Sequence, residues 1–190
     1  MKQVQEENLA GCCGIYCGLC PWFQSTAPSR CLGCRIRSQS VSCKRYNCCV
    51  KKNGFGTCAD CSAFPCEKYE KFFDWDSFVS HGPCLSNLEA IRKQGLKPWL
   101  NEQGARRKLL EQLLAHYNEG RSASFYCTAT TLLSPDVIAG ALEEAQRRMG
   151  ATRTADLDIK AKAKIVRTAI QERATVAGID LKLRHEEKQT

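Results

Sequence analysis

Cysteine is concentrated at one end of this chain. Twelve of its 14 cysteines lie between residues 12 and 66 of 190, and only Cys84 and Cys127 fall later. This first third has few aliphatic side chains and many turn-forming residues, and it shows no sustained helical or strand period. Such a segment buries too little apolar surface to offset the entropy of its own ordering. A covalent or coordinate bond must therefore hold it together.

The N-terminal residues help to decide between disulfides and metal, because disulfides persist outside the cell and clustered thiols inside it ligate metals. The first ten residues, MKQVQEENLA, are polar and lack the apolar run of a signal peptide. No stretch approaches the roughly 18 uninterrupted apolar residues of a membrane span. We therefore expect a soluble cytoplasmic protein without membrane contact, whose thiols act as thiolate ligands.

Ten cysteines have the spacing of metal ligands. A two-residue gap lets both sulfurs of a pair converge on one ion, and three pairs have it: Cys17/Cys20, Cys31/Cys34 and Cys58/Cys61. With the single thiols around them, the candidate ligands are Cys13, Cys17, Cys20, Cys31, Cys34, Cys43, Cys48, Cys58, Cys61 and Cys66. One grouping joins the first two pairs in one four-thiolate site, and Cys43/Cys48 with the third pair in another. Interleaved groupings fit the spacing equally well.

The identity of the metal stays open at this point. Tetrahedral all-thiolate sites suit zinc, and we predict about two zinc ions in a structural role. A 4Fe-4S iron–sulfur cluster with a redox or electron-transfer role is the alternative, favoured by the Cys13-x3-Cys17-x2-Cys20-Pro21 run. The same run matches the cluster motif of radical S-adenosylmethionine enzymes, but those resemble barrels of alternating strands and helices. More cysteines and then helices follow here.

The remaining four cysteines have less distinctive surroundings. Cys12 and Cys49 each adjoin a candidate ligand and are interpreted as extras. Cys127 has no histidine or other base beside it and is interpreted as a small buried hydrophobe. Cys84 follows a proline that begins a helix, so we expect it to pack rather than to ligate.

The net charge of +8, from 28 basic and 20 acidic residues, indicates little about partners. Basic side chains gather at 106–108 and 160–167 on predicted helices, and Arg121 lies in a glycine-containing turn. We interpret these as solvated faces and keep nucleic-acid binding as a weaker alternative to a role as a binding or regulatory module with a protein partner. The phosphate-binding, dinucleotide and nucleophile motifs of common enzymes are absent, so the sequence predicts no catalysis.

The architecture predicted is mostly α. An irregular, metal-bound, cysteine-rich lobe at 1–82, small α+β and like a zinc knuckle, packs on a helical lobe at 83–190, and Trp22, Trp75 and Trp99 join the two. Apolar spacing, caps and glycine stops predict helices over 67–78, 83–94, 98–117, 135–149 and 156–177. Residues 124–133 fit a buried helix or strand, and 179–183 alternate like a short strand.

Several segments resemble a known family. GCCGIYCGLCPWF, SRCLGCR and GTCADCSAFPCEKYEKF are similar to the cysteine-rich family called domain of unknown function 3795, and GRSASFYCTATTLL and GIDLKLR are similar to its longer members. The resemblance implies a soluble prokaryotic protein, frequent in anaerobes, with a metal site and no assigned activity. It also implies that the ten candidate thiols above are the ligands, and the anaerobic habit favours the cluster.

Overall fold

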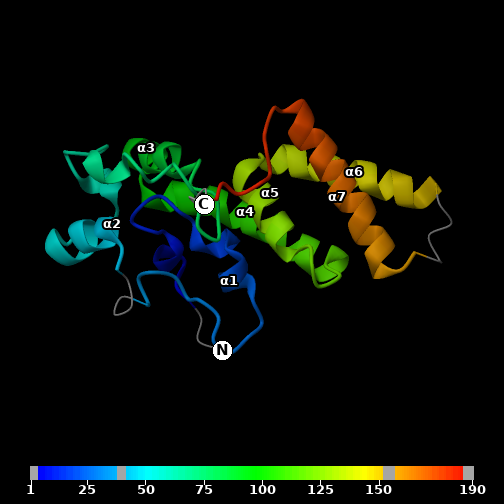
Figure 1. Ribbon diagram of the computed structural model, residues 1–190, viewed down its shortest axis with the longest axis horizontal. Coiled ribbons are helices and arrows are strands. Elements are labelled where there is room, and N and C mark those ends of the chain that lie inside the picture. The colour runs from blue at the N-terminus through cyan, green and yellow to red at the C-terminus, as the bar shows by residue number, and fades with distance from the viewer. Residues whose placement is uncertain (1–3, 38–41, 152–156, 186–190) are drawn as a thin grey trace, which may run out of the picture. The chain divides into compact units, whose positions relative to one another are not determined.

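The computed structural model describes residues 4–37, 42–151 and 157–185. Within these ranges the chain forms seven α-helices and no strand, so the prediction of a mostly helical protein is confirmed (Figure 1). None of the described helices is long and apolar enough to cross a membrane. The chain divides into two compact units, Met1–Gly104 with Leu183–Thr190 (unit 1) and Ala105–Lys182 (unit 2). The contacts thus place the first boundary between the units after Gly104, whereas the composition of the sequence changes near residue 82.

Unit 2 is built from long helices. They are the second part of α4 (Leu96–Tyr117), α5 (Ala123–Leu132), α6 (Pro135–Ala151) and α7 (Ile159–Val176). α5, α6 and α7 pack against one another, and α6 and α7 share the largest contact (Figure 1). The core lies on apolar stripes with helical spacing, since Ile138 and Ala141 on α6 and Val166 and Ile170 on α7 are at most 1% exposed.

Local signals set the ends of these helices. α6 begins at Pro135, after Ser134, whose hydroxyl accepts the N–H of Val137 at 3.4 Å. α7 begins after Asp158, whose carboxylate accepts the N–H of Ala161 at 2.8 Å. The helices predicted at 135–149 and 98–117 are confirmed, and 124–133 is a helix rather than a strand. The predicted start of the last helix, residue 156, lies outside the described residues.

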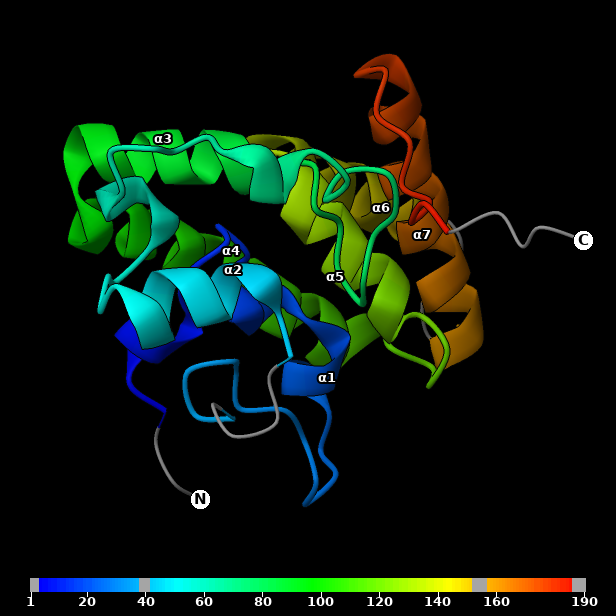
Figure 2. The same ribbon diagram turned by 60° about the vertical axis from the view of Figure 1, so that its left-hand side comes forward.

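Unit 1 has short elements until α3. They are 3-10 turns at Glu6–Leu9, Cys17–Leu19, Cys58–Asp60 and Glu67–Tyr69, helices α1 (Pro21–Gln24) and α2 (Lys44–Tyr46), and a π-helical turn at Asn47–Lys52 that continues α2. Irregular chain joins them (Figure 2). The β component expected here is absent from the described residues, where one isolated bridge pairs Ala10 with Tyr16.

The longest uninterrupted helix of unit 1 is α3 (Cys84–Gln94), as predicted. It buries Leu88 and Ile91, and it ends at Gly95, whose φ of +92° favours glycine. Trp99, 1% exposed, packs edge-on against Tyr16 with ring centroids 5.9 Å apart. Unit 1 therefore combines a small apolar core with long irregular segments.

Three further predictions for this chain are wrong. The helix at 67–78 is only a 3-10 turn, because the Asp76 carboxylate accepts the backbone N–H groups of His81 and Arg184 and holds the following segment in turns. The strand at 179–183 is absent, since the Asp180 carboxylate accepts the Lys182 N–H and forms a turn. Two of the three tryptophans expected in the core, Trp22 and Trp75, are 49% and 38% exposed.

Candidate thiol site

Two of the predicted cysteine pairs have the same backbone. Cys17 and Cys58 each begin a 3-10 turn, and the N–H of the second cysteine donates to the carbonyl of the first, at 3.0 Å for Cys20 and 3.2 Å for Cys61. At Cys58 the turn is fixed by Thr57, whose hydroxyl accepts the Ala59 N–H. The two-residue spacing therefore produces the tight turn that places two thiols on one side of the chain.

The third pair, Cys31 and Cys34, turns around a glycine. Gly33 has a φ of +95°, and its N–H donates to Cys31 Sγ at 3.4 Å. A Cβ on Gly33 would lie 3.6 Å from Cys17 Sγ, so this loop passes directly against the first pair. The amide turned toward a sulfur is the arrangement expected of a metal-binding turn.

Five thiols line one small cavity of about 30 Å³ in unit 1, which we call the thiol pocket. The π-helical turn places Cys48 and Cys49 there, and the next turns of chain bring Cys58, Cys61 and Cys66 to the same space. The other residues that line it are Arg45, Asn53, Phe55, Phe64, Lys68 and Tyr69. Beside the thiols, the lining consists of three aromatic rings, one asparagine and two cations.

Two arginines support this pocket from outside the cysteine pattern. Arg92, on α3, donates to the carbonyl oxygens of Ala59 at 3.0 Å, Cys61 at 2.7 Å and Phe64 at 3.4 Å. One guanidinium thus fixes the backbone that presents Cys58 and Cys61. Arg45 stacks over the Phe72 ring at 3.8 Å, and its buried Nε has no hydrogen-bond partner within the described residues.

Neighbouring thiols favour the thiolate form of Cys58. Hydrogen bonds from the Cys12 thiol and then from the Cys49 thiol outweigh burial and lower the pKa of Cys58 to about 3. The Tyr69 hydroxyl and the charge of Arg45 contribute in the same direction. Correspondingly, hydrogen bonding with Cys49 and Cys58 raises the pKa of Cys12. These hydrogen bonds favour the thiolate form of Cys58 and the protonated form of Cys12.

A second group of thiols lies around the first two pairs. Burial, followed by the charge of Cys34, raises the pKa of Cys17, and burial followed by charges that include Cys31 raises that of Cys20. Burial, then the charges of Cys13, Cys31 and Cys43, raises the pKa of Cys34 to about 11. The chain therefore brings these six predicted ligands into electrostatic range of one another.

The structure thus places Cys48, Cys58, Cys61 and Cys66 at the thiol pocket, while charge effects link the other six predicted ligands around the first two pairs. Cys13 also lies in electrostatic range of Cys58. Across the residues that the structure describes, no three or more His, Cys, Asp or Glu side chains are arranged to hold a metal ion. The assignment of particular thiols to particular ions remains a prediction.

Sequence reasoning missed several residues of these neighbourhoods. Cys49, interpreted as an extra, lines the pocket, and Cys12 hydrogen-bonds with Cys58. A hydrogen bond from Cys84 is the largest influence that lowers the pKa of Cys13. Because Cys12 and Cys13 are adjacent, as are Cys48 and Cys49, the sequence gave no signal of which thiol of each pair faces inward. Arg45 and Arg92 had no signal either, because their roles depend on segments distant in sequence.

Comparison with known proteins identifies no relative of this chain. No family model, curated protein or solved structure matches this chain. The resemblance to domain of unknown function 3795 therefore stands on the quoted motifs alone. The function must be inferred from the site itself.

Proposed function

We propose that unit 1 is a metal-binding module in which thiolates hold about two zinc ions in a structural role, and that the protein acts in the cytoplasm as a binding or regulatory module. The thiol pocket is the observation that carries this proposal. Cys48, Cys58, Cys61 and Cys66 line it, and four thiolates are the donor set of a closed structural zinc site.

The surroundings of the pocket fit a bound cation with thiolate ligands. A zinc ion with four thiolates carries a charge of about −2. Arg45 and Lys68 both line the pocket and offset that charge. The buried Arg45 Nε, without a partner among the described residues, is a donor for which a thiolate sulfur is a suitable acceptor.

The pocket residues would hold the ion by their sulfurs. The ion would then join three chain segments, namely the π-helical turn with Cys48, the turn with Cys58 and Cys61, and the chain at Cys66.

The second ion of this proposal belongs to Cys17, Cys20, Cys31 and Cys34. Support comes from the close approach of the Gly33 loop to Cys17 and from the amide that donates to Cys31 Sγ. Both pairs have the short turns that zinc-binding segments use. Cys13 and Cys43 lie in electrostatic range of Cys34 and complete the predicted ligand set.

Metal analysis of protein purified without oxygen tests the proposal. We expect about two zinc per chain, a colourless solution and no acid-labile sulfide. The double substitution of Cys58→Ser and Cys61→Ser should remove one zinc, and Cys17→Ser with Cys20→Ser should remove the other. Cys127→Ser is the matched control, because Cys127 is buried on α5 in unit 2, and it should leave the zinc content unchanged.

Two results would contradict the proposal. Stoichiometric iron and sulfide, with a broad absorption band at about 400 nm, would show that the thiols hold a redox-active cluster and not zinc. An unchanged zinc content in both double variants would show that these cysteines are not ligands. Loss of zinc in the Cys127 variant as well would mean that general unfolding, not ligand removal, releases the metal.

A further inference from the structure

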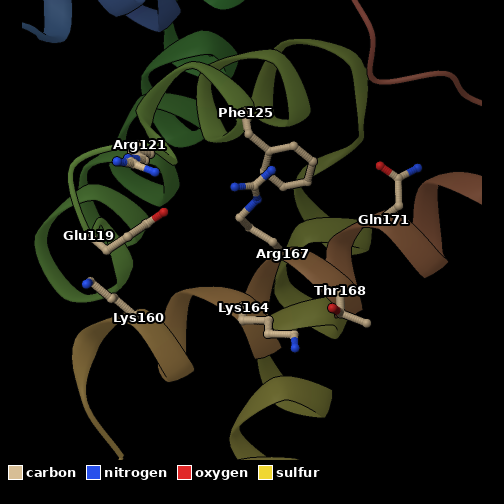
Figure 3. Close-up of a pocket in the computed structure, with 8 residues that line it drawn as sticks. All are labelled: Glu119, Arg121, Phe125, Lys160, Lys164, Arg167, Thr168 and Gln171. Atoms are coloured by element: carbon tan, nitrogen blue, oxygen red, sulfur yellow. The ribbon is translucent and has the colours of Figure 1, made fainter.

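Unit 2 contains a large cavity unrelated to the thiols, which we call the basic pocket. Its volume is about 710 Å³, and Figure 3 shows the side chains that line it. They are Glu119, Arg121, Phe125, Lys160, Lys164, Arg167, Thr168 and Gln171. Cavities of this size are typical of ligand sites rather than of the gaps left by packing.

Two parts of unit 2 build the pocket. Lys160, Lys164 and Arg167 recur at the spacing of one helix face on α7, and the opposite face carries Val166 and Ile170 into the core. The turn between α4 and α5 supplies Arg121 and Glu119, and the start of α5 supplies Phe125 (Figure 3). The polar residues of α7 therefore form one wall of a concavity, and the turn forms the other.

The charge of this wall is strongly one-sided. Four cations and one carboxylate line the pocket, and all four cations are exposed. None of them forms an ion pair of 4.0 Å or less with a carboxylate in the part of the chain that the structure describes. By contrast, Arg148 on α6 pairs with both Glu144 and Glu172. The Glu119 carboxylate lies in electrostatic range of Arg167 and Arg121, but the four cations outnumber it. An excess of cations gathered in a concavity concentrates anions there.

An aromatic ring lies among the cations. The guanidinium carbon of Arg167 is 4.9 Å from the centre of the Phe125 ring, and Figure 3 shows Arg167 reaching from α7 to that ring. The stacked pair presents a flat, partly apolar and positively charged surface. Such surfaces stack on nucleobases, because every base has an aromatic face.

We propose that the basic pocket binds a segment of single-stranded nucleic acid. Lys160, Lys164 and Arg121 neutralise successive phosphates, and the Phe125–Arg167 pair stacks against a base. A positively charged groove combined with an aromatic platform is the general design of single-strand binding without sequence preference. This proposal does not depend on metal in unit 1.

The distribution of the lining residues favours a strand over a free nucleotide. From Lys160 to Gln171 the polar face extends over three turns of α7, about 16 Å at 1.5 Å per residue, so several phosphates can be contacted in a row. A nucleotide site concentrates backbone N–H donors at a helix N-terminus, but here the Asp158 carboxylate caps that end of α7. A stiff duplex does not follow a concave wall of this kind.

Fluorescence polarisation of a labelled oligothymidylate with the full-length protein tests this proposal. We expect binding at about 50 mM salt that weakens steeply as salt rises. Lys160→Glu combined with Lys164→Glu should raise the Kd at least about tenfold. It should also reduce the log–log salt slope by about 1.4, because each phosphate that a protein neutralises on a single strand contributes about 0.7 to that slope. Both lysines are exposed, so the helical content measured by circular dichroism should be unchanged.

Lys108→Glu combined with Lys182→Glu is the matched control. Both lysines are exposed in unit 2 outside the pocket, and the change in net charge is the same. A Kd close to that of the original protein supports the proposal, whereas an equal weakening in both variants overturns it in favour of diffuse attraction. Absence of binding at low salt also overturns it. Displacement of the oligonucleotide by ATP at a lower phosphate concentration than by unlabelled oligonucleotide would assign the pocket to a nucleotide instead.

Discussion

Different interactions stabilise the interiors of the two units. Unit 2 buries apolar faces of helices 10 to 22 residues long, and residues such as Leu113 and Ile170 are fully buried. Up to residue 83, no described helical element of unit 1 exceeds six residues. Its irregular segments contain many cysteines and few aliphatic side chains. The comparison identifies unit 1 as the part of the chain whose stability needs a contribution beyond apolar burial.

The hydrogen bonds of polar groups also differ between the two units. In unit 2 the hydroxyls of Thr128 and Thr130 donate to carbonyls one turn back in their own helix, although Arg106 on α4 also donates to the carbonyls of Thr130 and Leu133. In unit 1 several polar bonds join distant segments. Asn87 donates to the carbonyl of Gly14, and Arg184 pairs with Asp76 across 108 residues.

These long-range polar bonds explain why local sequence says little about unit 1. A helix with an apolar stripe forms from signals within the helix, and its partner needs only another stripe. A turn held by an arginine from another segment forms only after that segment has arrived. Unit 1 should therefore depend on a few strong interactions, and unit 2 on many weak ones.

If unit 1 holds zinc as proposed, removal of the metal should have the largest effect on stability and should unfold unit 1 alone. Structural zinc contributes about 10 to 16 kcal/mol per ion in small peptides at neutral pH. All three tryptophans lie in unit 1, so their fluorescence reports on that unit. A strong zinc chelator should shift the tryptophan emission to that of solvent-exposed indole, while circular dichroism still shows the helices of unit 2.

Re-addition of zinc is the control for this experiment. It should restore the tryptophan emission, whereas magnesium should not, because thiolates bind magnesium poorly. Unchanged fluorescence after complete removal of metal would refute the view that coordination holds unit 1.

Shortening a buried side chain in the core of unit 2 should have the next largest effect on stability. Ile170 is fully buried on α7, and Ile170→Ala should lower the free energy of unfolding by about 2 to 5 kcal/mol. The change should appear in the helical transition followed by circular dichroism and not in the tryptophan transition. Val176→Ala, on the same helix at 88% exposure, should change stability by less than about 0.5 kcal/mol. Equal losses from both variants would argue against an apolar core at α7.

The Asp76–Arg184 pair should give an effect of intermediate size in unit 1. Burial raises the pKa of Asp76, but the Arg184 side chain and the N–H groups of Arg184 and His81 outweigh it and lower the pKa to about 2. Because the folded-state pKa lies below the unfolded one, this carboxylate stabilises unit 1 above about pH 4, by about 2 kcal/mol, and less as the pH falls toward 2. His81 faces the same carboxylate through its N–H.

Asp76→Asn tests this pair. The difference in the free energy of unfolding between the original protein and the variant should be constant from pH 7 to about pH 4 and should narrow below it. Denaturation followed by the fluorescence of unit 1 measures the difference. A difference that does not vary with pH would show that the carboxylate charge is unimportant and that only its shape or hydrogen bonds matter.

The helices of the second half could be predicted because their signals are local. Ser134-Pro135 and Gly95 mark ends that the structure keeps, and the stripe around Ile138 gives the buried face. The segment at 67–78 misled because its aromatic spacing suits a helix, while the carboxylate of Asp76 is engaged by Arg184 from the far end of the chain. No local pattern contains that contact.

The thiol neighbourhoods were predictable in part for the same reason. The pairs with two-residue spacing form tight turns at Cys17 and Cys58, and such a turn depends on local sequence. The spacing did not indicate that Cys12 hydrogen-bonds with Cys58, or that Arg92 would hold the carbonyl of Cys61. The basic residues of α7 were visible in the sequence as well. Their grouping with Phe125 around a cavity required the packing of α5 and α7.

The smallest effect should come from the cap of α7 in unit 2. The Asp158 carboxylate accepts the N–H of Ala161 at 2.8 Å, so Asp158→Ala should lower the free energy of unfolding by about 1 kcal/mol. Asp158→Asn keeps an oxygen acceptor and should lose only a few tenths of that amount. Chemical denaturation followed by circular dichroism can resolve the two variants. If Asn costs as much as Ala, the negative charge near the helix dipole, and not the cap hydrogen bond, is what stabilises this end of α7.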